Sequence, residues 1–354
     1  MLHLWSLLSL VGAIKVVSGS EGDRLYEFEA CKDHCQASLA CFGFENVGLE
    51  SADWKNHGNF QQASPIMNHL LLWDCESNCD YQCQQLITQE RVLDGDTVVQ
   101  FHGKWPFKRI LGMQEFFSTV FSVANFVPHY RGYKMLRKEL NAVPKHKKSR
   151  RLLQKYVYVA LAGMLAWFSS SVFHFRDLEV TEKLDYFFAG ATVLSGFHAI
   201  LIRIARLDKQ DEYRHLVSGA VLLIFTLHIL RQCLDWSYTY NMRFNVLFGV
   251  FQYILLLILA YMNYRRLMAG RQPRKTYNVP RRSMFVQLCV VPTGLVICTA
   301  LAMSCELYDF FNYDWQIDSH AIWHACTVLP SWKLYEFFIQ DFRYFDACDA
   351  ATVD

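Results

Sequence analysis

The stretch that decides the fold is residues 169–186, which read Ser-Ser-Ser-Val-Phe-His-Phe-Arg-Asp-Leu-Glu-Val-Thr-Glu-Lys-Leu-Asp-Tyr. An apolar run ends in Ser170-xxx-His174, a short charged segment follows, and a second apolar run begins at Asp185. Far along the chain, a third apolar run begins with His320-Ala-Ile-Trp-His324. Ionisable side chains at the ends of membrane spans are costly and indicate a functional site. We therefore expect these three ends to meet on one side of a membrane and to hold a metal.

The composition supports a membrane protein. The chain has 354 residues, of which 53% are hydrophobic. The hydrophobic residues gather in runs of the length that a membrane-spanning helix needs, about 20 residues. The predicted fold class is an all-α membrane protein, a seven-transmembrane helix bundle with a small disulfide-rich luminal N-terminal region. The expected spans are residues 110–130, 154–173, 185–204, 215–233, 244–263, 284–303 and 319–339.

The first 20 residues resemble a cleaved signal peptide. Residues 4–17 are mostly apolar, and Ser18-Gly19-Ser20 supplies small residues for cleavage. An uncleaved membrane anchor is the alternative, because the segment before the apolar run lacks Lys and Arg. The expected organisation is a signal peptide (1–20), a luminal cysteine-rich region (21–109), a seven-helix transmembrane domain (110–340) and a cytosolic C-terminal tail (341–354).

Six cysteines lie in the expected luminal region: Cys31, Cys35, Cys41, Cys75, Cys79 and Cys83. An even number of cysteines in a short segment that enters the secretory pathway predicts disulfides. Zinc thiolate coordination is the alternative. Cysteines at i and i+4 share a helix face, so we expect two short helices that are cross-linked to each other. An antiparallel arrangement favours the pairs Cys31–Cys83, Cys35–Cys79 and Cys41–Cys75.

The charges between the spans predict the orientation. Residues 131–155 carry ten Lys or Arg and one acid, and residues 264–283 carry seven Lys or Arg and no acid. Residues 304–318 carry four acids and no Lys or Arg. Loops rich in Lys and Arg stay in the cytosol. Seven spans with a luminal N-terminus and a cytosolic C-terminus satisfy all three loops, and they place Ser170, His174, Asp185, His320 and His324 on the luminal side.

These residues suit metal-assisted hydrolysis. Residues at i and i+4 share a helix face, so Ser170 projects with His174 and His320 with His324. Three imidazoles with an open fourth position form a known catalytic zinc arrangement. The predicted metal ligands are His174, His320 and His324. Asp185 is the expected proton acceptor, and Ser170 is the expected hydrogen-bond donor to a ligand or a developing oxyanion.

Each of these residues also has a simpler interpretation. A histidine inside a membrane span is more often a packed, hydrogen-bonded residue, and this is how we interpret His198 and His228. His228 lies nearer the site than His198 does and stays a minor candidate. Asp185 could instead cap its helix or neutralise the helix N-terminus. The joint placement of the three span ends favours the metal site.

Four sequence motifs resemble those of the Per-like proteins of GPI-anchor lipid remodelling. They are Ser170-xx-Phe173-His174-x-Arg176-Asp177, Glu182-Lys183-Leu184-Asp185-Tyr186-Phe187, Trp236-x-Tyr238-x-Tyr240-Asn241-Met242 and His320-Ala-Ile-Trp-His324. The resemblance also covers Cys75-xxx-Cys79-xxx-Cys83 and Phe101-His-Gly-Lys-Trp-Pro-Phe107, so it extends from about residue 25 to residue 340. The family belongs to the CREST superfamily, together with the alkaline ceramidases and the adiponectin receptors.

The resemblance implies a zinc-dependent enzyme. Its three histidines would bind zinc, and it would remove the sn-2 acyl chain from the phosphatidylinositol of GPI-anchored proteins, after which another enzyme adds a saturated chain. The implied partners are GPI-anchored proteins, their lipid and the membrane, and we expect no nucleic acid. The animal relatives suggest the Golgi membrane, with the endoplasmic reticulum as the alternative. Two other functions stay open, a heptahelical lipid-binding receptor with a structural metal and a ceramidase-like amidase. The cysteine-rich region favours the GPI enzyme over the amidase.

Overall fold

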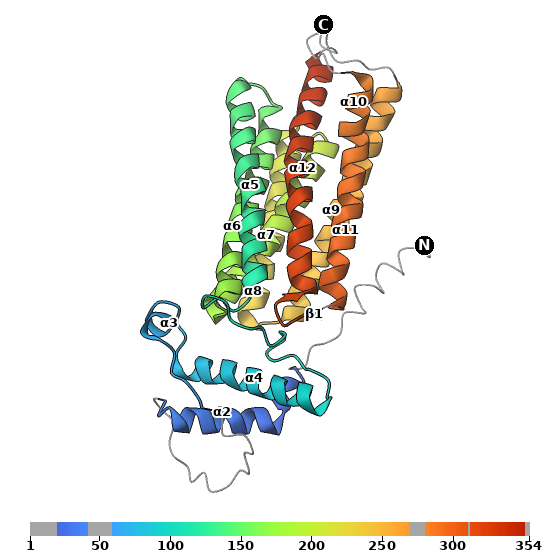
Figure 1. Ribbon diagram of the computed structural model, residues 1–354. Helices are drawn as coiled ribbons and strands as arrows, with labels where there is room; N and C mark the ends of the chain where they lie inside the picture. Colours follow the sequence, from blue (N-terminus) through green and yellow to red (C-terminus); the bar gives the residue numbers. More distant parts are fainter. Residues whose placement is uncertain (1–19, 42–58, 270–279, 311, 351–354) are drawn as a thin grey trace, which may run out of the picture.

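The structure is a computed structural model that describes residues 20–41, 59–269, 280–310 and 312–350. Within these ranges the chain forms a long helical bundle and a smaller N-terminal region that lies across one end of the bundle (Figure 1). The expected signal peptide lies outside the described residues except for Ser20. The last four residues of the expected C-terminal tail also lie outside them.

Seven helical segments in the described part of the chain form the bundle. They are α5 (Phe116–Ala142), α6 (Arg150–Phe175), α7 (Glu179–Ile204), α8 (Asp211–Leu234), α9 (Tyr238–Met268), a continuous segment of α10 (Arg281–Phe285), η2 (Val286–Val290) and α11 (Val291–Tyr308), and α12 (Ser319–Ala350). Five of them, α6 to α9 and the α10–α11 segment, are long and apolar enough to cross a membrane. The chain is therefore a multi-pass, all-helical membrane protein.

The first and last helices of the bundle differ from the expected spans. We expected the first span at residues 110–130, but α5 begins at Phe116 and continues to Ala142, through half of the basic segment that we interpreted as a loop. Likewise, α12 continues to Ala350, past residue 340 where we expected the helical domain to end. Both helices extend beyond the apolar run because residues there still pack into the core, among them Leu140 of α5 and Phe345 of α12.

The core of the bundle is formed mainly by α5, α6, α7 and α12. The Tyr156 ring of α6 stacks on the Phe338 ring of α12, with ring centroids 4.1 Å apart. A buried ion pair joins α7 to α12, because Arg203 Nε lies 2.6 Å from Asp341 Oδ2 and neither residue is exposed. Asn263 of α9 donates to the same carboxylate. Removal of one partner of such a pair leaves an uncompensated buried charge, which costs about 3–5 kcal/mol.

The N-terminal region is built on two helices, α2 (Tyr26–Ser38) and α4 (Cys75–Asp94), with the short segments η1 (Gly22–Arg24) and α3 (Pro65–His69) beside them. Asp74 caps α4 by accepting from the backbone N–H of Ser77 at 2.8 Å. Gly95 ends the helix with a positive φ of 80°, which glycine adopts without a Cβ clash.

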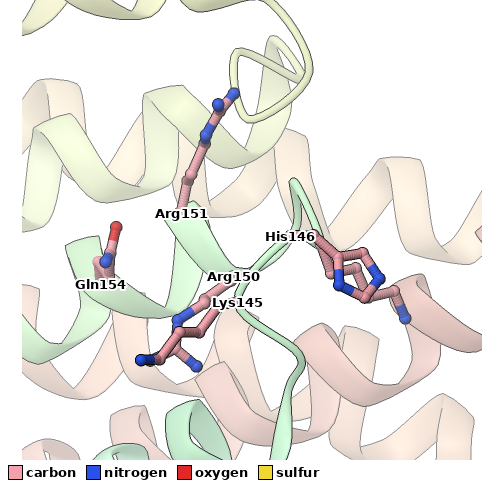
Figure 2. A pocket seen from close by; sticks show the side chains of 6 residues that line it. Lys145, His146, Arg150, Arg151 and Gln154 are labelled. Atoms are coloured by element: carbon pink, nitrogen blue, oxygen red, sulfur yellow. The ribbon is translucent and has the colours of Figure 1, made fainter.

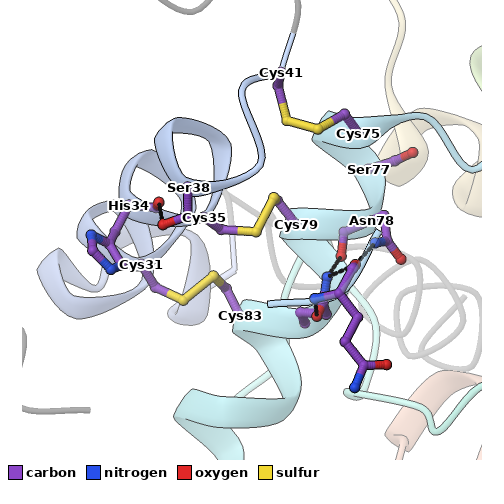
Figure 3. Close-up of a disulfide and its surroundings, with 12 residues drawn as sticks. Cys31, His34, Cys35, Ser38, Cys41, Cys75, Ser77, Asn78, Cys79 and Cys83 are labelled. Carbon is purple, nitrogen blue, oxygen red and sulfur yellow. Dashed lines mark hydrogen bonds between the residues drawn. A yellow bond between two sulfur atoms is a disulfide. The ribbon is translucent and has the colours of Figure 1, made fainter. Parts of the chain in front are cut away.

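Three disulfides cross-link these helices (Figure 3). The pairs are Cys31–Cys83, Cys35–Cys79 and Cys41–Cys75. This is the connectivity that antiparallel helices favour, so the predicted pairing is confirmed. The alternative of zinc thiolates is wrong for these residues because their sulfur atoms are bonded to each other. Each bridge contributes about 2–4 kcal/mol to a region too small to bury a large core.

Side-chain contacts attach the N-terminal region to the bundle. On one side, Lys108 Nζ lies 2.7 Å from Asp314, in the turn between the short strands β1 (Asn312–Tyr313) and β2 (Ile317–Asp318). On the other side, the Trp73 ring lies against two guanidinium groups, with centroid distances of 4.2 Å to Arg109 and 4.1 Å to Arg176. Arg176 follows α6 directly, so this stack holds the region against the end of α6.

Candidate metal centre and its surroundings

Three histidines from two helices meet at the end of the bundle that faces the N-terminal region. His174 lies in the last turn of α6, and His320 and His324 lie in the first two turns of α12. His320 Nε2 is 3.2 Å from His174 Nε2 and 2.9 Å from His324 Nε2. His174 and His324 are buried, and His320 is partly buried. The structure thus brings together the three predicted metal ligands.

In each of the three rings, the second nitrogen, Nδ1, has a hydrogen-bond partner that determines whether this nitrogen carries a hydrogen. His174 Nδ1 lies 2.8 Å from Glu115 Oε2, and His320 Nδ1 contacts Glu306 Oε2. A carboxylate can only accept, so each Nδ1 carries the hydrogen. His324 Nδ1 lies 2.9 Å from Ser122 Oγ.

Ser122 is also an acceptor at this contact. Its hydroxyl donates to the Ser118 carbonyl at 2.7 Å, so its oxygen accepts from His324 Nδ1. When all three imidazoles are neutral, their Nε2 atoms therefore carry lone pairs. These lone pairs converge on one another, so a cation, either a proton or a metal ion, is needed among them.

The donor set fits zinc. A tetrahedral zinc about 2.0–2.1 Å from each nitrogen places its ligands about 3.3–3.4 Å apart. The two measured Nε2–Nε2 distances, 3.2 and 2.9 Å, are close to this value. Carboxylates behind two of the imidazoles complete the carboxylate–histidine arrangement that is typical of zinc sites. These three histidines are a possible metal-binding group by the distances between their ligand atoms.

Ser170 and Asp185 lie beside the histidines. Ser170 is buried one turn before His174, and its Oγ is 3.1 Å from Ser122 Oγ. The Asp185 carboxyl interacts with the Ser170 hydroxyl across the α6–α7 interface. Asp185 does not cap its helix, because α7 begins at Glu179 and its N-cap is Leu178. The cap interpretation is therefore wrong, as is the expected start of this span at residue 185.

Four residues of this site were not predicted as part of it: Lys104, Glu115, Ser122 and Glu306. Glu115 and Glu306 were visible as acids in or beside apolar runs, but no sequence spacing connects them to the histidines. Ser122 carried no signal. Lys104 belongs to the motif Phe101-His-Gly-Lys-Trp-Pro-Phe107, which carries part of the family resemblance but was given no role in the site.

The Lys104 side chain contacts two carboxylates beside the histidine cluster. Its Nζ lies 2.6 Å from Glu115 Oε1 and 2.8 Å from Asp177 Oδ2. Burial alone would lower the pKa of Lys104, but the carboxylates of Asp177 and Glu115 raise this pKa above its ordinary value. Lys104 therefore stays charged and orients the carboxylate that holds His174.

His198 and His228, which we interpreted as packed residues of the bundle, lie apart from the three-histidine cluster. His198 Nε2 is 3.0 Å from Ser218 Oγ, so this residue is hydrogen-bonded within the bundle as expected. The His228 ring stacks on Phe244, with centroids 3.8 Å apart, but within the described part of the chain neither of its ring nitrogens has a hydrogen-bond partner. His228 is therefore packed as expected but not hydrogen-bonded as expected. Neither histidine contacts the three converging rings among the described interactions.

Comparisons with known proteins show which family this chain resembles. The family model for the Per1-like family matches residues 65–342. Protein PER1 of Saccharomyces cerevisiae is 49% identical over 338 residues, which cover 93% of this chain and 94% of that protein. GPI-specific phospholipase A2-like PGAP3 of Homo sapiens is 31% identical over 336 residues, with coverage of 95% and 93%. Post-GPI attachment to proteins factor 3 of Drosophila melanogaster is 29% identical over 339 residues, with coverage of 94% and 92%. No solved structure matches the chain significantly.

Proposed function

The chain belongs to the Per1-like family, and from this premise we propose that it acts in GPI-anchor remodelling as a lipid hydrolase. Its substrate is the phosphatidylinositol of GPI-anchored proteins, from which it removes the sn-2 acyl chain. The lyso-GPI is then reacylated with a saturated chain by another enzyme. The names of the PGAP3 relatives, which describe a GPI-specific phospholipase A2-like protein, support this reaction class.

One observation carries the hydrolase proposal, the convergence of three imidazole lone pairs next to an acid and a hydroxyl. We propose that His174, His320 and His324 hold zinc. When bound, zinc supplies Lewis-acid chemistry, because it polarises a carbonyl and acidifies water. Glu115 and Glu306 fix the ring protons on the outer nitrogens, so the inner nitrogens stay free for the metal.

Asp185 and Ser170 perform the remaining steps. Asp185 accepts a proton from the attacking water, whose oxygen bonds to the sn-2 carbonyl carbon. The Ser170 hydroxyl, rotated from Ser122 toward the substrate, donates a hydrogen bond to the developing oxyanion. The bond from the carbonyl carbon to the glycerol oxygen then breaks, and that oxygen takes the proton from Asp185. The products are a free fatty acid and the lyso-GPI.

The three-histidine ligand group, with Asp185 outside it, favours a hydrolase over a receptor with a structural metal. A structural zinc site closes all four positions with protein ligands, whereas a catalytic site keeps one position open. Here the described ligand group has three histidines, and Asp185 stands apart from it. The opening is thus available to water or to a substrate.

We propose seven spans with the histidine cluster on the luminal side and the C-terminus in the cytosol. The opposite end of the bundle carries the basic residues, which line a cavity of about 400 Å³ between the 143–149 loop and the start of α6 (Figure 2). Lys145, Arg150 and Arg151 lie there. Positively charged loops stay in the cytosol, so this end is the cytosolic one. We expect residence in the Golgi membrane, with the endoplasmic reticulum as the alternative.

Mass spectrometry of GPI lipids tests the function. Cells that lack the protein should retain the original sn-2 chain, and expression of the wild-type chain should restore remodelling. His174→Ala, His320→Ala and His324→Ala should each fail to restore it. His198→Ala is the matched control, because His198 is hydrogen-bonded within the bundle but lies outside the cluster. This variant should restore remodelling fully. Full remodelling by any of the three cluster variants would contradict the proposed site.

A further inference from the structure

The N-terminal region carries a patch of exposed aliphatic residues beside the end of the bundle. Four residues form this aliphatic patch: Ile66, Leu70, Leu72 and Leu111. They are 68%, 74%, 53% and 82% exposed, respectively. Single exposed leucines are common on protein surfaces, but a cluster of large apolar residues indicates a contact with another protein or with a membrane.

The aliphatic patch is one surface built from two parts of the chain. Ile66 and Leu70 lie one helical turn apart in α3, and the Leu70 backbone N–H donates to the Ile66 carbonyl at 3.0 Å. Their side chains therefore share a face. The Trp73 indole N–H donates to the Gly112 carbonyl at 3.1 Å. This bond joins the segment after α3 to the turn that carries Leu111.

Two residues of the patch also have an unusual backbone conformation. Leu72 and Leu111 have positive φ angles of 57° and 54°. Leucine adopts this left-handed conformation rarely, whereas glycine and asparagine adopt it more easily. A turn on an aqueous surface would gain nothing from an exposed leucine at either position. The observed strain therefore points to a function for these side chains.

The attachment of the patch to α6 determines its depth in the membrane. Arg176 follows α6 directly, and its guanidinium donates to the Leu72 carbonyl at 2.9 Å. The 26 residues of α6 span about 39 Å at 1.5 Å per residue. The hydrocarbon layer of a bilayer is about 30 Å thick, and the head groups increase this to about 40–45 Å. The end of α6, and Leu72 with it, therefore lies in the head-group layer.

The lipid-facing surface of α6 leads to the patch. Phe168 and Val172 are exposed on this helix, which is apolar enough to cross a membrane. They are four residues apart and Arg176 follows at the same spacing, so the three residues lie on one face. The Trp73 ring that stacks on Arg176 is of a type typical of the membrane–water interface. α3 lies to the side of this end of the bundle, where lipid would surround it (Figure 1).

We propose that the aliphatic patch is a membrane anchor of the N-terminal region, inserted in the leaflet on the side of the three histidines. Its partner is the lipid bilayer, at the boundary between head groups and acyl chains. Interfacial helices bury their apolar faces at this depth. The anchor holds the cysteine-rich region on the membrane beside α6. This inference requires only that the bundle spans a membrane, and it is independent of the proposed reaction.

A second copy of the chain or a different protein matches the patch less well. Either would have to reach it through the head-group layer, on a surface that continues the lipid-facing side of α6. The four side chains of the patch also offer no charge and no hydrogen-bonding group. Protein interfaces normally include such groups, about one hydrogen bond per 100–200 Å². Lipid tails need none of them.

Photolabelling from the lipid tests the anchor on the wild-type, full-length protein. The protein is placed in phosphatidylcholine vesicles that include a phosphatidylcholine with a diazirine near the start of one acyl chain. After irradiation, mass spectrometry of peptides should find label within residues 65–72 and 109–113. The peptide of α6 with Phe168 and Val172 is the positive control. α2 lies on the far side of α4 from the bundle, so its exposed Tyr26 should stay unlabelled (Figure 1).

Label on α6 without label on the aliphatic patch would overturn the proposal. A second copy or another protein over the patch would give this result. Equal labelling of the patch and of α2 would also overturn it, because the label would then not report insertion.

A double variant tests whether the side chains themselves hold the region on the membrane. Leu70→Asn/Leu111→Asn removes two of them, and asparagine tolerates the left-handed backbone at residue 111. Label within residues 65–72 should fall at least about tenfold, because burial of each aliphatic side chain favours insertion. Leu93→Asn, at an equally exposed leucine of α4, is the matched control and should leave the labelling unchanged.

Non-reducing peptide mapping checks that each variant keeps the three disulfides. Undiminished labelling of a double variant with intact disulfides would overturn the anchor. If a variant loses its disulfides, the labelling of the wild-type protein alone decides.

Discussion

At the scale of single residues, the site depends on where protons lie. The imidazoles of His174 and His320 each donate from Nδ1 to a carboxylate. The His324 imidazole donates from Nδ1 to Ser122, whose own hydroxyl hydrogen is donated to a backbone carbonyl. In the neutral imidazole, each outer contact therefore leaves Nε2 with a lone pair. The second layer of the site thus decides whether the first layer can bind a cation.

The two carboxylates behind the histidines should tune metal affinity. Glu115→Gln and Glu306→Gln keep the size of the side chain but remove the negative charge that makes the imidazole a better ligand. We expect zinc affinity to fall about 10–100-fold in each variant. Competition with a chelator of known affinity, on the purified full-length protein, measures this. Glu139→Gln, far from the cluster, should bind zinc as the wild type does. Unchanged affinity in both site variants would show that these contacts only orient the rings.

Asp185 should be needed for the reaction but not for the metal. Asp185→Asn keeps the shape of the side chain and removes the proton acceptor. We expect zinc content to be retained while GPI remodelling falls by about two orders of magnitude or more, the scale of general-base catalysis. Zinc analysis and GPI lipid mass spectrometry on the same preparations separate the two effects. Wild-type remodelling in this variant would show that Asp185 has only a structural role.

The sequence predicted the inner layer of the site but not the outer one. His320 and His324 share a helix face by spacing, and the charges of the loops placed His174 on the same side of the membrane. Glu115 and Glu306 could not be connected in this way, since 59 residues separate Glu115 from His174. Such contacts depend on how α5 and α11 pack against their neighbours, which no local pattern records.

At the scale of elements, the disulfide pairing was predictable because helical spacing and an antiparallel arrangement leave one regular solution. Cys31, Cys35 and Cys41 pair in reverse order with Cys83, Cys79 and Cys75. The ends of α5 and α12 were not predictable from apolar runs. Both helices continue through polar residues, because helix length depends on caps and packing as well as on the thickness of the hydrocarbon layer.

His102 should make the N-terminal region more stable at mildly acidic pH. Its Nε2 lies 2.8 Å from Asp80 of α4, and its Nδ1 lies 3.4 Å from Asp23 of η1. The hydrogen bond to Asp80 and the charges of both acids raise the pKa of His102 above its ordinary value of 6.5, against the effect of burial. The stabilisation is therefore fully present below pH 6.5 and is lost as the pH rises through the raised pKa.

Hydrogen exchange checks this dependence in the full-length protein. Protection of residues 75–104, corrected for intrinsic exchange rates, should decrease between about pH 5.5 and pH 8 in the wild type. His102→Gln cannot gain the proton, so its protection should vary less over the same range. Identical pH profiles for the two proteins would show that the His102 contacts do not contribute.

At the scale of the whole molecule, the N-terminal region and the bundle form one site. Lys104 reaches from the former to the carboxylate that holds His174, and the stack of Arg109, Trp73 and Arg176 fixes the end of α6. The cysteine-rich region therefore contributes to the orientation of His174, a proposed metal ligand. It also lies over the end of the bundle where a GPI head group would stand above its lipid.

The proposed function depends on the orientation of the molecule in the membrane, which protease protection can measure. A tag inserted in the 143–149 loop should be digested by protease outside sealed microsomes, and a tag in the turn at Asp314 should be protected. The physical reason is the cluster of Lys and Arg at the first end and of acids at the second. Detergent should expose both tags, which controls for tags that are simply inaccessible. The reverse pattern would open the histidine cluster to the cytosol. A mature GPI anchor carries its protein on the luminal face, so its lipid in that leaflet would then be out of reach, and the proposed hydrolysis would be impossible.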